Sequence, residues 1–137
     1  MASDVGDELR AAVVQRAVGR CEYCLIHERD AGFPHQVDHI VSRKHGGLTT
    51  LENLALACVL CNRYKGTDIA SIDSETGKLV RLFNPRQDLW TDHFSLNGAT
   101  IKAVSPIGGV TVTLLRLNAT ERTAERLLLQ ELGMYPR

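Results

Sequence analysis

Four cysteines are arranged as two Cys-x2-Cys pairs, Cys21 with Cys24 and Cys58 with Cys61. Thiolates two residues apart can bind one metal ion through a tight turn, and four of them complete the tetrahedral shell of a structural zinc ion. The alternatives are a pair of redox thiols or four buried free cysteines, although a thioredoxin-like redox site needs only one such pair at the start of a helix. The spacing therefore predicts structural Zn²⁺ bound by all four cysteines.

Asp38 and His39 lie side by side in the long segment between the two cysteine pairs. Histidine is the side chain best suited to proton transfer near neutral pH. A lone histidine is nevertheless more often a hydrogen-bonded structural residue, and neighbours on a strand point to opposite faces. The two side chains would reach one metal site only where the strand ends, so the pair alone leaves catalysis and structure both open.

Residues 35–66 carry four basic and two acidic side chains, a local net charge of +2. Such cations could hold phosphate groups on either side of a cleaved bond, and the alternative is a solvated face. Lys65 is the strongest candidate because it lies one helical turn beyond Asn62. The predicted nucleic-acid contacts are Arg43, Lys44, His45, Arg63 and Lys65.

The elements that must position these groups follow from the apolar pattern. Residues 7–18 repeat at helical spacing, and we expect that helix to pack under the first cysteine pair. Residues 36–41 alternate as a strand, and residues 55–57 could pair with it. A short helix from Asn62 to about residue 69 would complete a compact unit.

Residues 71–137 show no spacing typical of a site and are predicted to be a scaffold. We expect a strand over 78–83, a helical turn within 87–93, and strands over 94–105 and 108–117 joined by a turn at Pro106–Gly109. A final helix would be capped by Asn118 or Thr120. Its predicted apolar face is formed by Leu127, Leu128 and Leu132.

Taken together, the order and spacing of these residues resemble the HNH endonucleases of the ββα-metal superfamily. The resemblance covers about residues 20–66, and it is carried by Cys21-x2-Cys24, Asp38-His39-Ile40, His45-Gly46-Gly47, Leu51-Glu52-Asn53-Leu54 and Cys58-x2-Cys61-Asn62-x2-Lys65-Gly66. It implies an α+β fold with a zinc-stabilised ββα-metal core, an N-terminal helix, and a C-terminal β-hairpin plus helix. We expect a single domain over 1–137, with the core at about 20–70 and accessory elements at about 71–137.

The resemblance also implies a role for each matched residue. His39 would be the general base that activates water, and Asn53 would brace the loop and orient His39. Asp38 and Asn62 would hold a catalytic ion, with Asn62 at a position where the family has His or Asn, which makes this chain an HNN variant. One carboxylate and one amide oxygen are hard ligands, so Mg²⁺ or Mn²⁺ is favoured there. The implied activity is metal-dependent hydrolysis of phosphodiester bonds, with DNA as the expected substrate.

Composition limits the remaining possibilities. The 137 residues have a formal net charge of zero, so any nucleic-acid contact must be local. No apolar run is long enough to span a bilayer, and Met1–Asp4 does not begin a secretory signal, so we expect a cytoplasmic protein without a membrane partner. A homo-oligomer is compatible with the sequence but not indicated by it. Two other functions stay open: a zinc-stabilised nucleic-acid or protein binding module without chemistry, and a thiol oxidoreductase.

Overall fold

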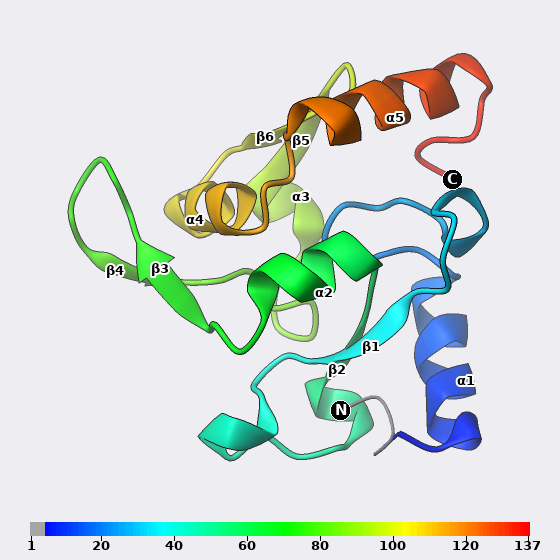
Figure 1. The fold of residues 1–137 in the computed structure, drawn as a ribbon. Helices are drawn as coiled ribbons and strands as arrows, with labels where there is room; N and C mark the ends of the chain where they lie inside the picture. The colour runs from blue at the N-terminus through cyan, green and yellow to red at the C-terminus, as the bar shows by residue number, and fades with distance from the viewer. Residues whose placement is uncertain (1–4) are drawn as a thin grey trace.

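The computed structural model describes residues 5–137 and shows small antiparallel strand pairs and five α-helices among them. The expected α+β class is confirmed (Figure 1). The helices are α1 (Asp7–Ala17), α2 (Val59–Lys65), α3 (Trp90–His93), α4 (Pro106–Leu114) and α5 (Thr120–Glu131). The strands are β1 (Gln36–His39), β2 (Leu54–Ala57), β3 (Ala70–Ile72), β4 (Leu79–Arg81), β5 (Phe94–Asn97) and β6 (Thr100–Ala103). Short 3-10 turns are η2 (Glu28–Asp30), η3 (Arg43–His45) and η4 (Leu51–Asn53).

The antiparallel pair β1–β2 divides the first half of the chain into two packed faces. On one face, Leu54 and Leu56 of β2 join Val37 of β1 in a core with Val13 of α1. On the other face, Ala55 and Ala57 belong to the core that contains the cysteines. This alternation places α1 behind the sheet, so the prediction that this helix packs under the first cysteine pair is wrong. The apolar side chains of α1, Val13 above all, instead pack on the apolar face of the β1–β2 pair.

Helix α2 follows β2 directly, which gives the β1, β2, α2 order of the predicted unit. Cys58 is the N-cap residue of α2, and its sulfur accepts a hydrogen bond from the Cys61 amide. The helix ends at Lys65 rather than near residue 69, because Gly66 follows with φ +52°. Figure 1 shows α2 over the β1–β2 pair, with α1 at the other side.

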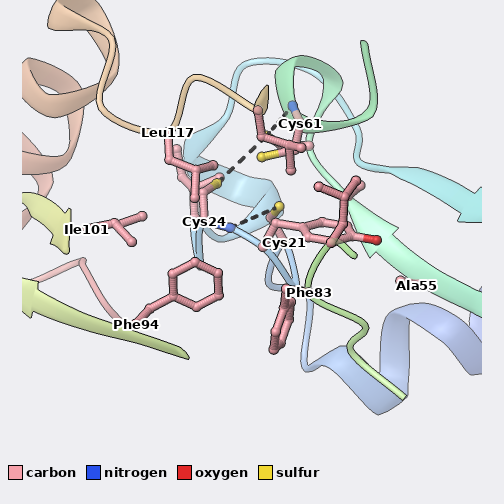
Figure 2. Close-up of a cluster of buried hydrophobic side chains, with 14 of the residues drawn as sticks. Cys21, Cys24, Ala55, Cys61, Phe83, Phe94, Ile101 and Leu117 are labelled. Atoms are coloured by element: carbon pink, nitrogen blue, oxygen red, sulfur yellow. Dashed lines mark hydrogen bonds between the residues drawn. The ribbon is translucent and has the colours of Figure 1, made fainter. Parts of the chain in front are cut away.

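The second half of the chain shares a single core with the cysteines. Phe83 and Phe94 pack edge to face, with ring centroids 5.2 Å apart. Figure 2 shows these rings beside Cys21 and Cys24, with Ile101 and Leu117 completing the cluster. The scaffold segment is therefore packed onto the metal-ligand region rather than set apart from it.

The predicted strand over 108–117 is wrong, because α4 occupies most of that segment. Pro106 stands in the first turn of α4, and the Ser105 hydroxyl caps the helix by accepting from the Gly108 amide. Pro at the start of a helix is favoured because its missing N–H would be unpaired there anyway. The hairpin does exist, but its strands are β5 and β6 and its turn lies at Gly98.

Helix α5 buries the face opposite to the one predicted from its leucines. Arg122, Arg126 and Leu129 are buried. The three leucines assigned to the apolar face are exposed: Leu127, Leu128 and Leu132. Neither predicted cap is used, since Ala119 is the N-cap residue and Asn118 instead bonds to the backbone of Ile101.

Candidate functional site

The four cysteines form one buried cluster whose sulfur atoms all lie within 4.8 Å of one another. The sulfurs of Cys24 and Cys58 are 3.7 Å apart, far beyond the S–S length of about 2.05 Å in a disulfide. A tetrahedral zinc with Zn–S bonds of about 2.3 Å separates its sulfurs by about 3.8 Å. The donor set and its spacing therefore fit a structural zinc ion.

Burial shapes the electrostatics of the cysteine cluster. Desolvation raises the pKa of the Cys21 and Cys61 thiols well above their ordinary values. Backbone amides already point at the sulfurs, from Cys24 to Cys21 and from Cys61 to Cys58. These N–H groups favour the thiolate form that a metal ion needs.

A separate cleft of about 560 Å³ lies between β1, the turn after it and α2. The residues that line it include Asp38, His39 and Asn62, an acid, an imidazole and an amide. Arg43 and Lys44, both exposed, also line this cleft. Five of the predicted site residues are thus brought together at one place.

Asp38 is buried, and its carboxylate is held from two sides. The Tyr23 hydroxyl donates to Oδ2 at 2.8 Å, and Lys65 Nζ donates to Oδ1 at 3.3 Å. Burial raises the pKa of Asp38 above its ordinary value, and the charge of Lys65 partly opposes that rise. Burial and the Asp38 charge raise the pKa of Tyr23 as well, which keeps its hydroxyl a donor.

His39 and Asn53 are both anchored to the loop that follows β1. Nε2 of His39 lies 2.9 Å from the Thr49 hydroxyl, a hydrogen bond that orients the ring. The Asn53 amide accepts from the Val41 N–H at 3.0 Å and donates to the Val41 and Leu48 carbonyls at 2.9 and 2.8 Å. One amide thus ties both ends of the 41–48 loop, and Asn53 itself lies outside the residues that line the cleft.

Asn62 projects from the first turns of α2 toward β1, where its Nδ2 donates to the Gln36 Oε1. With Nδ2 bound in this way, Oδ1 is the atom whose lone pairs could coordinate a cation. Gln36 also lines the cleft.

Comparison with protein families bears on this arrangement directly. The model of the HNH endonuclease family matches residues 21–68, a segment that contains β1, β2, α2 and all four cysteines. This chain carries an HNH domain. No curated protein and no solved structure gave a significant match. The match covers 48 of the 137 residues, and the family that it names consists generally of nucleases, whose substrate is nucleic acid.

Within the HNH domain, the five residues predicted to contact nucleic acid do not all lie at the cleft. Arg43 and Lys44 line the cleft, whereas Arg63 lines a different cavity beside the cysteines. His45 is exposed in η3 but is not among the residues that line the cleft. Lys65 is 2% exposed, so the prediction that it contacts phosphate does not fit the structure. From the sequence alone, a lysine near the end of a short helix, such as Lys65, is expected to be exposed; only the tertiary packing shows that it is buried.

Three residues of the HNH domain and one outside it were missed from the sequence. Tyr23 and Gln36 bond to Asp38 and Asn62, and Thr49 bonds to His39. Tyr23 lies inside the first cysteine pair, which placed it near a site but gave no sign of its partner. Arg122, which donates to two of the cysteine sulfurs, lies far downstream, and no sequence signal indicates it.

Within residues 5–137, none of the helices has the length and apolar character needed to cross a membrane.

Proposed function

We propose that this protein is a metal-dependent endonuclease that hydrolyses phosphodiester bonds in DNA. The observation that carries the proposal is the cleft shared by Asp38, His39 and Asn62, flanked by two exposed cations. Hydrolysis needs a base for the attacking water and positive charge near the phosphoryl oxygens.

His39 is assigned as the general base. His39 lines the cleft, whose volume of about 560 Å³ can hold water and a phosphate group, and its Nε2 lies 2.9 Å from the Thr49 hydroxyl. A base whose ring cannot rotate removes the proton from one defined direction. Asn53 acts on this base indirectly, because it bonds to the carbonyl of Leu48, the residue before Thr49.

Asp38 and Asn62 are assigned as the ligands of the catalytic ion. Tyr23 and Lys65 use about three of the roughly four lone-pair positions of the Asp38 carboxylate, which leaves room for one further partner. One carboxylate oxygen and one amide oxygen suit Mg²⁺ or Mn²⁺. Such an ion would polarise the phosphoryl group and stabilise the leaving oxygen. Arg43 and Lys44 are assigned to flanking phosphates.

Lys65 is assigned a positioning role instead of a phosphate contact. Its Nζ also donates to the backbone carbonyls of His39 and Ile40, at 3.2 and 3.0 Å. The same ammonium group therefore fixes the acidic side chain and the end of the strand that carries the base.

The test is cleavage of supercoiled plasmid by purified protein with Mg²⁺, with Mn²⁺ and with EDTA. His39→Ala should lose nearly all cleavage, and a general base typically contributes about 10²–10⁴-fold to the rate. His27→Ala is the matched control, since His27 lies outside the cleft. Zinc content and circular dichroism of each variant establish that the fold is intact.

No cleavage of duplex DNA, single-stranded DNA or RNA by the zinc-loaded, folded protein would refute the nuclease. If such a protein still bound nucleic acid with affinity unchanged by His39→Ala, the non-catalytic binding module would be the correct function. Cleavage of RNA alone would refute the assignment of DNA as the substrate.

A further inference from the structure

Arg122 of α5 reaches the cysteine cluster from outside the HNH domain. Its Nη2 donates to the Cys61 sulfur at 3.1 Å and lies 3.6 Å from the Cys58 sulfur. Its Nη1 donates to the backbone carbonyls of Leu115 and Arg116, at 2.8 and 3.3 Å. One guanidinium therefore joins the second cysteine pair to the end of α4.

Arg122 as a whole is 6% exposed, so its side chain has little access to water. A buried cation is costly unless an anion faces it. Among the residues that the structure describes, Arg122 has no carboxylate partner, and its acceptors are two sulfurs and two carbonyl oxygens. The Glu125 carboxylate, one turn along α5, is a nearby negative charge but accepts no hydrogen bond from Arg122. Zinc bound by four thiolates carries a net charge of −2, which would face this guanidinium directly through the sulfurs that it contacts.

Other contacts bring the same C-terminal region onto the first cysteine pair. The Tyr135 hydroxyl donates to the Cys24 carbonyl at 2.7 Å, and the Trp90 indole N–H donates to the Tyr23 carbonyl at 2.9 Å. Leu117 and Leu129 lie in the same core as the cysteines. In Figure 2, Leu117 is drawn beside Cys24. Residues beyond the family match thus contact both cysteine pairs.

We propose that Arg122 is a positioning residue of the zinc centre, which stabilises zinc-bound Cys58 and Cys61 and links zinc retention to the packing of α5. Hydrogen bonds to metal-bound sulfur hold the ligand in place and lower its tendency to leave the metal. Coupling free energies are reciprocal. The free energy that a docked α5 adds to zinc binding through Arg122 therefore equals the free energy that bound zinc adds to the docking of α5. The proposal holds whether or not the protein cleaves DNA.

The matched pair of variants is Arg122→Met and Arg126→Met. Arg126 is also buried on the same helix, but it bonds to the Ala99 carbonyl and the Asn118 amide oxygen and to no sulfur. Zinc transfer to a chromophoric chelator is followed after mixing. Loss of a residue that holds a metal ligand in place typically weakens metal affinity about 10–100-fold, so Arg122→Met should release zinc at least about tenfold faster than Arg126→Met. Equal release from the two variants would overturn the proposal.

A spectroscopic readout separates sulfur contact from general packing. In the Co²⁺-substituted protein, the sulfur-to-cobalt charge-transfer band should move to lower energy in Arg122→Met, because the sulfur lone pairs lose a donor and a nearby positive charge. Arg122→Lys, which keeps the positive charge but not the planar guanidinium with its several N–H donors, should shift the band less. A band unchanged in both variants would overturn the proposal.

The wild-type protein provides a test that needs no variant. After zinc removal, amide hydrogen exchange should accelerate more in α5 than in α1, since α1 packs on the opposite face of the β1–β2 pair. Protection of α5 that persists, or that falls only as much as that of α1, would overturn the link between zinc and α5.

Discussion

Lys65 and Asp38 form an ion pair in the interior, with Nζ 3.2 Å from Oδ2 and both side chains at most 3% exposed. Asp38 lies on β1 and Lys65 at the end of α2, so the pair joins two of the three elements of the ββα unit. The Tyr23 hydroxyl donates a hydrogen bond to the same carboxylate. This contact orders the acidic wall of the cleft before any ligand binds.

Lys65→Met should therefore destabilise the fold, because it leaves the Asp38 carboxylate buried without a counter-charge. Breaking a buried pair on one side costs about 3–5 kcal/mol. The free energy of unfolding, measured in urea with zinc present, reports the loss. Arg63→Met, an exposed cation on the same helix, should change it by less than about 0.5 kcal/mol. A Lys65→Met protein of unchanged stability but reduced DNA affinity would restore the phosphate-contact role.

Asn53→Ala should loosen the 41–48 loop while the zinc centre stays intact. The substitution leaves the Val41 N–H and two carbonyl oxygens without their side-chain partner, a loss of about 1–3 kcal/mol per buried group that water does not reach. Cleavage should fall by a larger factor than zinc content. Glu52→Ala, at the exposed neighbouring position, is the control. Full cleavage by Asn53→Ala would show that the brace is dispensable.

Gly47→Ala should displace the same loop through a steric clash. A Cβ at this position would lie 1.7 Å from the Val41 carbonyl oxygen and 2.8 Å from the Asn53 Nδ2. Overpacking of this kind costs about 1–3 kcal/mol or more. Gly46→Ala meets no atom within 4 Å and adds only the strain of φ +87°, about 1–2 kcal/mol. Thermal unfolding of the two variants compares these costs, and a Gly46→Ala protein less stable than Gly47→Ala would contradict the structure.

Leu129→Ala and Leu128→Ala test which face of α5 is buried. Leu129 is 8% exposed and lies in the cysteine core, whereas Leu128 is 57% exposed. Truncating a buried leucine costs about 2–5 kcal/mol, and an exposed one about 0.5 kcal/mol or less. Urea unfolding should separate the two variants clearly. The reverse order would restore the apolar face predicted from the sequence.

The β1–β2–α2 unit and the zinc cluster could be predicted from the sequence because their signals are local. Paired cysteines, a strand with alternating residues and a short apolar strand lie close together, and each constrains its own backbone. The same local signals misplaced the strand after Pro106. The β-branched run Val110-Thr111-Val112-Thr113 favours a strand by propensity, yet tertiary packing overrides it. Gly108, in the first turns of α4, lies so close to the His93 carbonyl that a Cβ there would be 2.1 Å from the carbonyl oxygen.

Where charged side chains point was decided by the tertiary structure alone. The sequence gives no reason to expect that Lys65 and Arg122 are buried, because a charge is buried favourably only opposite a partner from elsewhere in the chain. Those partners are 27 and 61 residues away, at Asp38 and Cys61. The sequence by itself determined which residues could bind metal and move a proton, because that chemistry belongs to the residue types and their spacing. Only the fold decided which of them meet and which cations lie inside, because burial and charge pairing depend on contacts between distant segments.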